Sequence, residues 1–262
     1  MQIIIPIGFV AALALVLGLG LAFVSEKLAV PVDEHEEHIL AVLPGVNCGA
    51  CGFSGCAGYA KALHTGAETN AGLCAPGGDE VAQEIGKLTG FSSEHIVPQV
   101  AVVRCQGGEN VAKKTYHYSG MRSCRMAAQL AGGVKACPCG CIGLGDCAVV
   151  CPYDAIRVCP DGIARVESEK CRACKACVAV CPKDLIVLVQ KEHPVPAVLC
   201  CSTLKGGDTR KVCTKGCIGC KKCEKVCPNG AAKVTNFMAR IDADRCIACG
   251  ECAKVCPVGA IQ

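Results

Sequence analysis

Residues 217–228 read CIGCKKCEKVCP, and residues 246–257 read CIACGECAKVCP. Both stretches have the spacing C-x2-C-x2-C-x3-C-P, which is typical of cysteines that ligate cubane 4Fe–4S clusters. Three thiolates in a tight loop bind three irons of one cubane, and the fourth, on the short helix that follows, reaches a second cluster. A single C-x2-C pair would indicate little, but two such runs in succession predict a two-cluster iron–sulfur domain.

The same pattern occurs upstream, so the motif forms an internal repeat. Residues 171–182 carry it without deviation, and residues 137–152 carry an altered form, C-x3-C-x5-C-x3-C-P. The segment 137–182 recurs as 213–257, at an offset of 75 to 76 residues. We infer two tandem two-cluster domains of the bacterial ferredoxin type.

One ligand position differs between the two copies. Leu144 takes the place of Cys220, and Cys137 aligns with Cys213. The pattern predicts that the first copy has lost one ligand and uses Cys137 instead. The predicted ligand sets, crossed between the halves of each domain, are Cys137, Cys141, Cys147 with Cys181; Cys171, Cys174, Cys177 with Cys151; Cys217, Cys220, Cys223 with Cys256; and Cys246, Cys249, Cys252 with Cys227.

A fifth group of cysteines precedes the repeat. Cys48, Cys51, Cys56 and Cys74 have the spacing C-x2-C-x4-C-x17-C and lie among many glycines. Glycines let the backbone wrap closely and point N–H groups at the sulfurs. Four cysteines also suit tetrahedral zinc, but this spacing is not the usual pair of C-x2-C knuckles. A fifth 4Fe–4S cluster is therefore expected here.

The composition agrees with clusters and argues against disulfides. The chain has 27 cysteines in 262 residues, 3% aromatic residues and no Trp. A conventional core for this length would bury more large side chains, so inorganic groups are expected to fill the interior. Cysteines two residues apart cannot all reach separate disulfide partners, and an odd count leaves one thiol unpaired. We infer a reducing compartment.

The formal net charge of +4 treats every cysteine as neutral. A cubane held by four thiolates contributes about −2, so five such sites would take the net charge to roughly −6. The charge therefore gives no support to a nucleic-acid partner. The lysines of residues 205–225 are a local exception, and they could dock an acidic ferredoxin or form an ordinary solvated surface. These lysines are Lys205, Lys211, Lys215, Lys221, Lys222 and Lys225.

The N-terminus is apolar. Residues 3–24 contain no charged side chain, which is long enough for a helix to cross a hydrocarbon core of about 30 Å. A cleaved signal peptide is the alternative, but the positive n-region that it requires is missing. We expect an α+β chain with this order: a transmembrane anchor at 1–27, a 4Fe–4S domain at 33–95, a linker at 96–135, and ferredoxin-like domains at 136–190 and 191–262.

Local signals predict smaller elements. Asp33 is expected to cap a short helix that reaches about residue 43. Residues 155–158 and 163–166 read as two strands around an Asp-Gly turn, and residues 232–241 repeat the signal. These hairpins would cover the clusters and exclude water.

Seven cysteines lie outside the predicted ligand sets: Cys105, Cys124, Cys139, Cys159, Cys200, Cys201 and Cys213. Cys159 adjoins a predicted turn and is expected to be a free thiol. Cys105, Cys124, Cys201 and Cys213 could hold a sixth cluster or be buried thiols, and the sequence does not separate these alternatives.

The chain as a whole resembles the B subunit of the Rnf complex. The resemblance rests on the apolar N-terminus, on residues 47–52 (NCGACG) and 74–78 (CAPGG), and on the downstream ferredoxin domains. Residues 103–108 (VRCQGG) and 137–147 (CPCGCIGLGDC) are similar to the longer form found in anaerobes. Cys139 departs from that pattern, in which an aromatic residue is usual. The match covers nearly the whole chain.

The resemblance implies a membrane oxidoreductase that couples electron flow between reduced ferredoxin and NAD to Na⁺ or H⁺ translocation. The B subunit would receive electrons from soluble ferredoxin and relay them to other Rnf subunits, which would hold the flavin and nicotinamide sites. The lack of a G-x-G-x-x-G or Walker motif agrees with this division. We therefore expect a single-pass protein of the cytoplasmic (inner) membrane, with its iron–sulfur domains on the cytoplasmic side.

Other classes share parts of this pattern. The cysteines alone also permit a polyferredoxin-like component of another membrane reductase or hydrogenase complex. A soluble iron–sulfur partner of a corrinoid protein would share only the Cys48–Cys74 block. A zinc-bearing interaction scaffold is disfavoured by the four runs that end in Cys-Pro.

Overall fold

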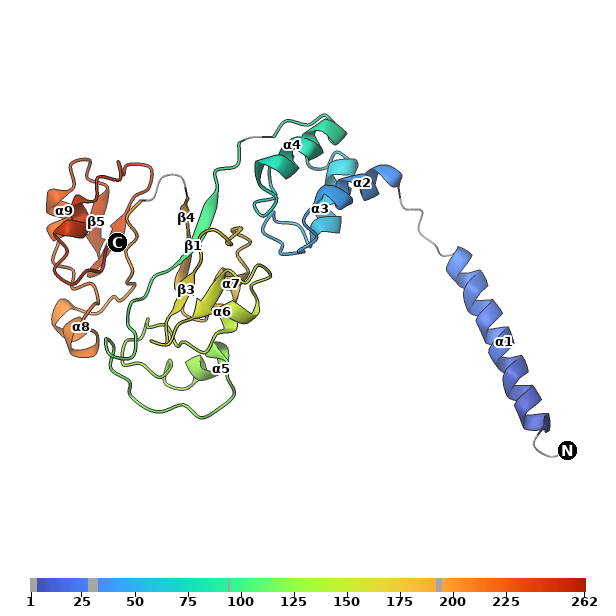
Figure 1. Cartoon of the computed structure of the whole chain (residues 1–262), viewed down its shortest axis with the longest axis horizontal. Helices are drawn as coiled ribbons and strands as arrows, with labels where there is room; N and C mark the ends of the chain where they lie inside the picture. Colours follow the sequence, from blue (N-terminus) through green and yellow to red (C-terminus); the bar gives the residue numbers. More distant parts are fainter. Residues whose placement is uncertain (1–3, 28–32, 94, 192–194) are drawn as a thin grey trace. The chain divides into compact units, whose positions relative to one another are not determined.

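The computed structural model describes residues 4–27, 33–93, 95–191 and 195–262, and the chain divides into two units, residues 1–38 and 39–262. The first unit contains α1 (Ile4–Lys27) and the start of α2 (Glu34–Val42) (Figure 1). The predicted helix after Asp33 is confirmed, because α2 begins at the next residue and the Asp33 carboxylate accepts the His35 N–H at 2.9 Å.

The structure corrects the prediction of an N-terminal transmembrane helix. A helix needs about 20 consecutive apolar residues to cross a bilayer core. The side chains of α1 are described at residue 9 and at residues 11–25, a stretch shorter than that length. Within the residues that the structure describes, no helix is both long enough and apolar enough to span a membrane. This part of the predicted fold class is therefore wrong.

The second unit begins with a small helical domain. It consists of the end of α2, α3 (Cys56–His64) and α4 (Gly78–Thr89). Ile39, Tyr59, Leu63 and Ile85 form its buried core, and Cys74 lies in the same core. The Tyr59 hydroxyl donates to Asn70 O at 2.7 Å, which fixes the loop that leads to Cys74.

The first ferredoxin domain contains more of the chain than its cysteine motifs. Its elements are β1 (Gln99–Val103), α5 (Cys124–Gln129), α6 (Asp146–Val149), β2 (Ile156–Val158), β3 (Ala164–Val166), α7 (Ala176–Val180) and β4 (Ile186–Gln190). β1 and β4 form an antiparallel pair with Ala101 opposite Leu188, and they lie side by side in Figure 1. Both β1 and α5 fall within residues 96–135, the predicted linker, and β1 pairs with β4.

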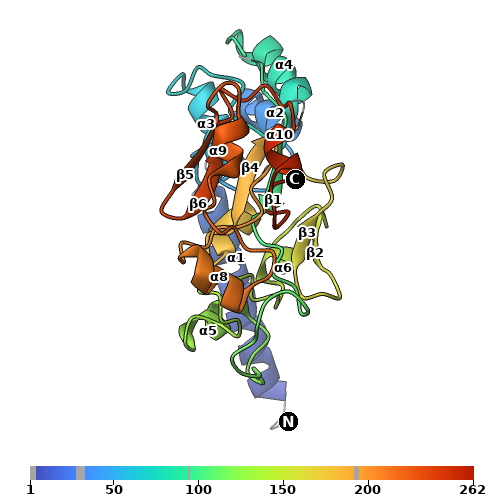
Figure 2. The same ribbon diagram turned by 90° about the vertical axis from the view of Figure 1, so that its left-hand side faces the viewer.

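The second ferredoxin domain repeats the arrangement. Its elements are α8 (Gly206–Val212), α9 (Lys222–Val226), β5 (Ala232–Thr235), β6 (Met238–Ile241) and α10 (Glu251–Lys254). Both predicted hairpins are confirmed, because β2 pairs with β3 and β5 pairs with β6, each antiparallel. Figure 2 shows the β5–β6 hairpin below α9. Cysteines lie in all four apolar cores of the described chain, as the shortage of large side chains predicts.

Candidate metal centres

The four cysteines of the small domain lie close together. Burial raises the pKa of Cys74 to about 11, and the charges of Cys56, Cys48 and Cys51 act in the same direction. Asn47 holds the start of α3, because its side-chain oxygen accepts the Cys56 N–H at 2.8 Å. Cys51, Cys56 and Cys74 pack in the core of this domain, and the charge of Cys48 acts on Cys74.

Each ferredoxin-type loop makes the same turn before its third cysteine. The residue two positions before that cysteine has a left-handed conformation: Gly145 (φ 94°), Lys175 (φ 61°), Lys221 (φ 59°) and Gly250 (φ 74°). A short helix starts directly after it in every case. The turn reverses the loop and places the third cysteine in the first helical turn, facing the other two.

A cavity marks the second ligand set of the first domain. Cys151, Cys171, Cys174 and Cys177 all line it. The Ala155 N–H donates to Cys151 Sγ at 3.3 Å, and the Ala101 N–H of β1 donates to Cys171 Sγ at 3.4 Å. The structure therefore brings together the four residues of this predicted set.

The equivalent set of the second domain also lines a cavity. Its members are Cys227, Cys246, Cys249 and Cys252. The Ala248 N–H donates to Cys246 Sγ at 3.4 Å. A hydrogen bond from the Ala232 N–H, with others from residues 229–231, holds the pKa of Cys227 below its usual range. N–H groups aimed at sulfur favour the thiolate that binds iron.

The remaining set of the second domain combines buried and exposed ligands. Burial raises the pKa of Cys223 to about 11, and the charges of Cys217 and Cys220 act in the same direction. Cys256 packs against the same core, and its sulfur accepts the Ala260 N–H at 3.3 Å. Cys220 and Cys249 are the exposed cysteines of the described chain, so this domain brings its ligands to the surface.

The altered set of the first domain differs from the prediction. Cys141, Cys147 and Cys181 line one cavity, and the fourth cysteine in it is Cys124. Burial raises the pKa of Cys147 to about 12, and the charges of Cys141, Cys124 and Cys181 raise it further. Cys137 lines a different cavity. The structure thus joins three of the four predicted residues and adds Cys124.

Asp146 positions Cys124. Its carboxylate accepts the Cys124 N–H at 2.8 Å, the Arg125 N–H at 3.1 Å and the Ser123 hydroxyl at 2.9 Å. Although burial acts to raise the pKa of Asp146, these hydrogen bonds hold it below its usual range. The sequence contains one signal for this role, a Ser that can cap a helix directly before a cysteine, and Ser123 is the N-cap of α5.

The donor sets suit iron–sulfur clusters better than single metal ions. Among the residues described, no group of three or more His, Cys, Asp or Glu side chains is arranged to hold one metal ion. In a cubane each thiolate binds a different iron, so its cysteines surround a larger space. Cysteine-only donors, N–H groups aimed at sulfur and cysteine-lined cavities fit that group.

Comparison with known proteins agrees with this arrangement. A family model described as a 4Fe-4S dicluster domain matches residues 140–185 and again residues 216–260. A second model, described as a putative Fe-S cluster, matches residues 43–76. The three matched segments contain each of the cysteine groups described above, except that Cys124 lies outside them.

Several relatives match over most of their length. The chain is 38% identical over 243 residues to the B subunit of the Na⁺-translocating ferredoxin:NAD⁺ oxidoreductase complex of Acetobacterium woodii, over 93% of this chain and 72% of that protein. It is 40% identical over 240 residues to the B subunit of the ion-translocating oxidoreductase complex of Methanosarcina acetivorans, over 91% and 90%. It is 39% identical over 233 residues to the B subunit of the proton-translocating ferredoxin:NAD⁺ oxidoreductase complex of Clostridium ljungdahlii, over 88% and 81%.

Proposed function

The chain belongs to the family formed by the B subunits of ion-translocating ferredoxin:NAD⁺ oxidoreductase (Rnf) complexes, and from this premise we propose a route by which it relays electrons. It is an iron–sulfur electron-relay component of such an oxidoreductase, and the other Rnf subunits are its partners. The observation that carries the proposed route is the grouping of the cysteines: three cavities are each lined by four of them, and the other eight fall in the small domain and around Cys223.

We propose that each group holds one 4Fe–4S cluster. The ligand sets are Cys48, Cys51, Cys56, Cys74; Cys124, Cys141, Cys147, Cys181; Cys151, Cys171, Cys174, Cys177; Cys217, Cys220, Cys223, Cys256; and Cys227, Cys246, Cys249, Cys252. Four of these sets keep the ligands expected from sequence. In the fifth, Cys124 replaces Cys137 because it lies beside Cys141, Cys147 and Cys181.

The protein residues favour a bound, ionised sulfur. A 4Fe–4S cluster supplies one-electron chemistry without a change of bonds. Burial raises the pKa of several of these thiols, Cys74, Cys147 and Cys223 among them, and this cost is offset when a thiolate binds iron. Backbone N–H groups aimed at Cys151, Cys227 and Cys256 stabilise the negative charge on each sulfur.

Electrons enter through the second ferredoxin domain. Its ligands Cys220 and Cys249 are exposed, whereas no ligand of the small domain or of the first ferredoxin domain is, and all of these ligands lie in the described part of the chain. Lys221, Lys222 and Lys225 adjoin Cys220 and are also exposed. A positive surface beside an exposed ligand suits an acidic soluble ferredoxin, because complementary charge accelerates the encounter.

The relay operates at a membrane through the other subunits of the complex. Thiolate ligands need a reducing compartment, so the iron–sulfur domains face the cytoplasm. Ion translocation, whether of Na⁺ or of H⁺, and the reaction with NAD⁺ take place in the partner subunits.

The test is a metal analysis of the full chain purified without oxygen. We expect at least about 20 iron atoms and as many acid-labile sulfides per chain, and electron paramagnetic resonance signals on addition of reduced ferredoxin. Stoichiometric zinc with no acid-labile sulfide would overturn the proposal. Iron that reduced ferredoxin cannot reduce would leave the clusters in place but remove the entry route.

A further inference from the structure

A fourth cavity lined by cysteines lies between the two ferredoxin domains. Its cysteines are Cys105, Cys137, Cys139, Cys200, Cys201 and Cys213, none of which belongs to the five sets above. Like the three cavities at the ferredoxin-type ligand sets, it is lined by at least four cysteines.

Four of the six cysteines are arranged in equivalent pairs. Cys137 precedes Cys141 by four residues, and Cys213 precedes Cys217 by four. Cys105 Sγ accepts the Cys141 N–H at 3.4 Å, and Cys200 Sγ accepts the N–H of Cys217, the equivalent residue in the repeat. Each domain thus contributes two cysteines. One lies four residues before Cys141 or Cys217, and the other is more distant from that residue in the sequence.

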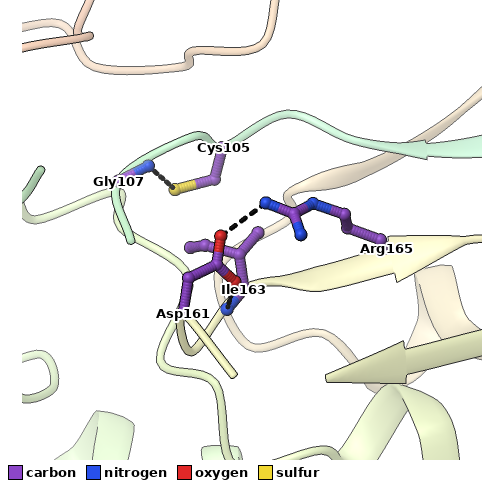
Figure 3. Close-up of polar contacts among 5 residues, drawn as sticks. All are labelled: Cys105, Gly107, Asp161, Ile163 and Arg165. Atoms are coloured by element: carbon purple, nitrogen blue, oxygen red, sulfur yellow. Dashed lines mark hydrogen bonds and ion pairs between the residues drawn. The ribbon is translucent and has the colours of Figure 1, made fainter. Parts of the chain in front are cut away.

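Two of the four sulfurs accept the backbone N–H of the residue two positions ahead: Gly107 donates to Cys105 Sγ at 3.4 Å, and Ser202 donates to Cys200 Sγ at 3.5 Å. The backbone of Cys139 and of Lys215 acts in the same sense on Cys137 and Cys213, where it opposes the rise in pKa that burial causes. Figure 3 shows the Gly107 N–H pointing at the Cys105 sulfur. Cys174 and Cys246, in the ferredoxin-type sets, accept the N–H of Ala176 and Ala248 in this way. The local geometry of the four is therefore that of the proposed cluster ligands.

The other two cysteines of the cavity lack this feature. The Cys201 thiol acts as a donor, to Arg104 O at 3.6 Å and to Cys139 O at 3.7 Å. A thiol that donates keeps its proton and is not a thiolate ligand. Cys139 supplies its backbone N–H to Cys137 instead.

A buried lysine beside the cavity has no hydrogen-bond partner in the described part of the protein. Lys135 is only 8% exposed, and among the described residues its Nζ has no hydrogen-bond partner. Its side chain packs at Gly140, where an added Cβ would meet Lys135 Cδ at 3.3 Å, and its charge acts on the sulfurs of Cys141 and Cys213. A buried ammonium is stable only beside compensating negative charge, which a cubane with four thiolates supplies.

We propose that Cys105, Cys137, Cys200 and Cys213 hold a sixth 4Fe–4S cluster that connects the two ferredoxin domains. The site shares a hydrogen bond with Cys141 on one side and with Cys217 on the other. One electron passes between these two ligand sets through the site, so one set loses the electron that the other gains and no bond changes. The cluster itself does not depend on the proposed function; only its role in the relay does.

The test counts clusters in the full chain, purified and reconstituted without oxygen, by iron and sulfide analysis and by native mass spectrometry. We expect about 24 iron atoms in the unaltered chain and about 20 in the Cys213→Ala and Cys105→Ala variants. The matched controls Cys201→Ala and Cys139→Ala, in the same cavity, keep about 24. Lys135→Met keeps the cluster and makes one reduction potential more negative, while the other potentials stay unchanged.

The outcomes separate this proposal from the function above. About 20 iron atoms in the unaltered chain, with no loss in Cys213→Ala, overturns the sixth cluster and leaves the other five. Far fewer than about 20 in the unaltered chain overturns the proposed relay instead. If one cysteine variant fails to fold, the unaltered chain and the variant in the other domain still decide between about 24 and about 20.

Discussion

The two ferredoxin domains share one cysteine pattern but complete equivalent ligand sets in different ways. In the second domain Cys220 lies within the loop, between Cys217 and Cys223. In the first domain Leu144 has that position, and Cys124 reaches the site from α5. On the proposed assignment, the first domain takes its fourth ligand from outside the motif, and Asp146 anchors the backbone of that residue.

The domains also differ in exposure. Cys124, Cys141, Cys174 and Cys177 of the first domain are buried, whereas the second domain exposes Cys220 and Cys249. A buried ligand set suits transfer within the protein, and an exposed one suits exchange with a partner. The exposed set is the one proposed above to receive electrons from ferredoxin.

The largest expected effect is the loss of a whole cluster from the first domain. Cys124→Ala should remove about four iron atoms, because Cys141, Cys147 and Cys181 then lack a fourth thiolate. Adding Leu144→Cys to this variant should restore them by recreating the loop of the second domain. Iron analysis measures both. An unchanged count in Cys124→Ala, or a failed rescue, would contradict the assignment of Cys124.

Equivalent glycines should respond unequally to substitution. An added Cβ at Gly143 would lie 2.3 Å from Gly162 O, and at Gly219 it would lie 2.9 Å from Phe237 O. Both residues have positive φ, which costs a non-Gly residue about 1–2 kcal/mol. We expect Gly143→Ala to lower the free energy of unfolding by about 3–4 kcal/mol and Gly219→Ala by about 2 kcal/mol. Anaerobic denaturant titrations of both variants would test this order.

Loss of the Asp146 anchor should be milder. Asp146→Ala removes three hydrogen bonds around Cys124 and should destabilise the protein by about 2 kcal/mol, with partial loss of iron. Lys222, the equivalent residue of the second domain, is exposed, so Lys222→Ala is the matched control and should change stability little.

The anchor also predicts a pH dependence. The pKa of Asp146 is lowered in the folded state, so its stabilising contribution is complete above the unfolded value of about 3.9 and is lost as the pH falls through the lower folded value. The stability difference between the natural chain and Asp146→Ala should therefore be constant at neutral pH and shrink only in acid. A difference that already shrinks at neutral pH would assign the effect to another group.

The smallest effect concerns the surface of the second domain. Reversal of Lys221 and Lys222 to Glu should slow reduction by ferredoxin at low salt by up to about tenfold, and the difference should fade as salt screens the charges. A variant with Lys61 and Lys87 reversed to Glu, in the small domain, carries the same charge change and should keep the natural rate. Equal rates for all three proteins would remove docking from the proposed route.

Much of the architecture follows from local sequence. The C-x2-C-x2-C runs predict where three ligands turn into one site, and the Asp-Gly and equivalent turns predict the hairpins β2–β3 and β5–β6, which the structure confirms. These signals work because a turn and its ligands lie within a few residues of each other. The same short spacing predicts which cysteine ends each run, and this is the cysteine expected to bind the other cluster of its domain.

Contacts between distant segments do not follow from such local signals. Cys124 lies on a helix outside the cysteine motifs, yet it lines the same cavity as Cys181. Likewise, β1 pairs with β4 although a long stretch of chain separates Val103 from Ile186. Alignment within the repeat puts Cys137 at a ligand position, but it does not say which of two adjoining cavities the side chain enters. At the N-terminus the error has another cause. Apolar composition alone predicts a membrane-spanning helix, but no helix among the described residues is long and apolar enough to be one.

Arg104 has a mechanical consequence for the relay. Its backbone N–H donates to Leu185 O in the first ferredoxin domain, while its guanidinium donates to Val198 O and Cys200 O and contacts Met238 Sδ in the second. One side chain thus clamps the junction at three points, and hinge motion there would break all three at once. Since the speed of electron tunnelling depends steeply on separation, a junction held at these points would keep the proposed clusters on its two sides at a fixed distance.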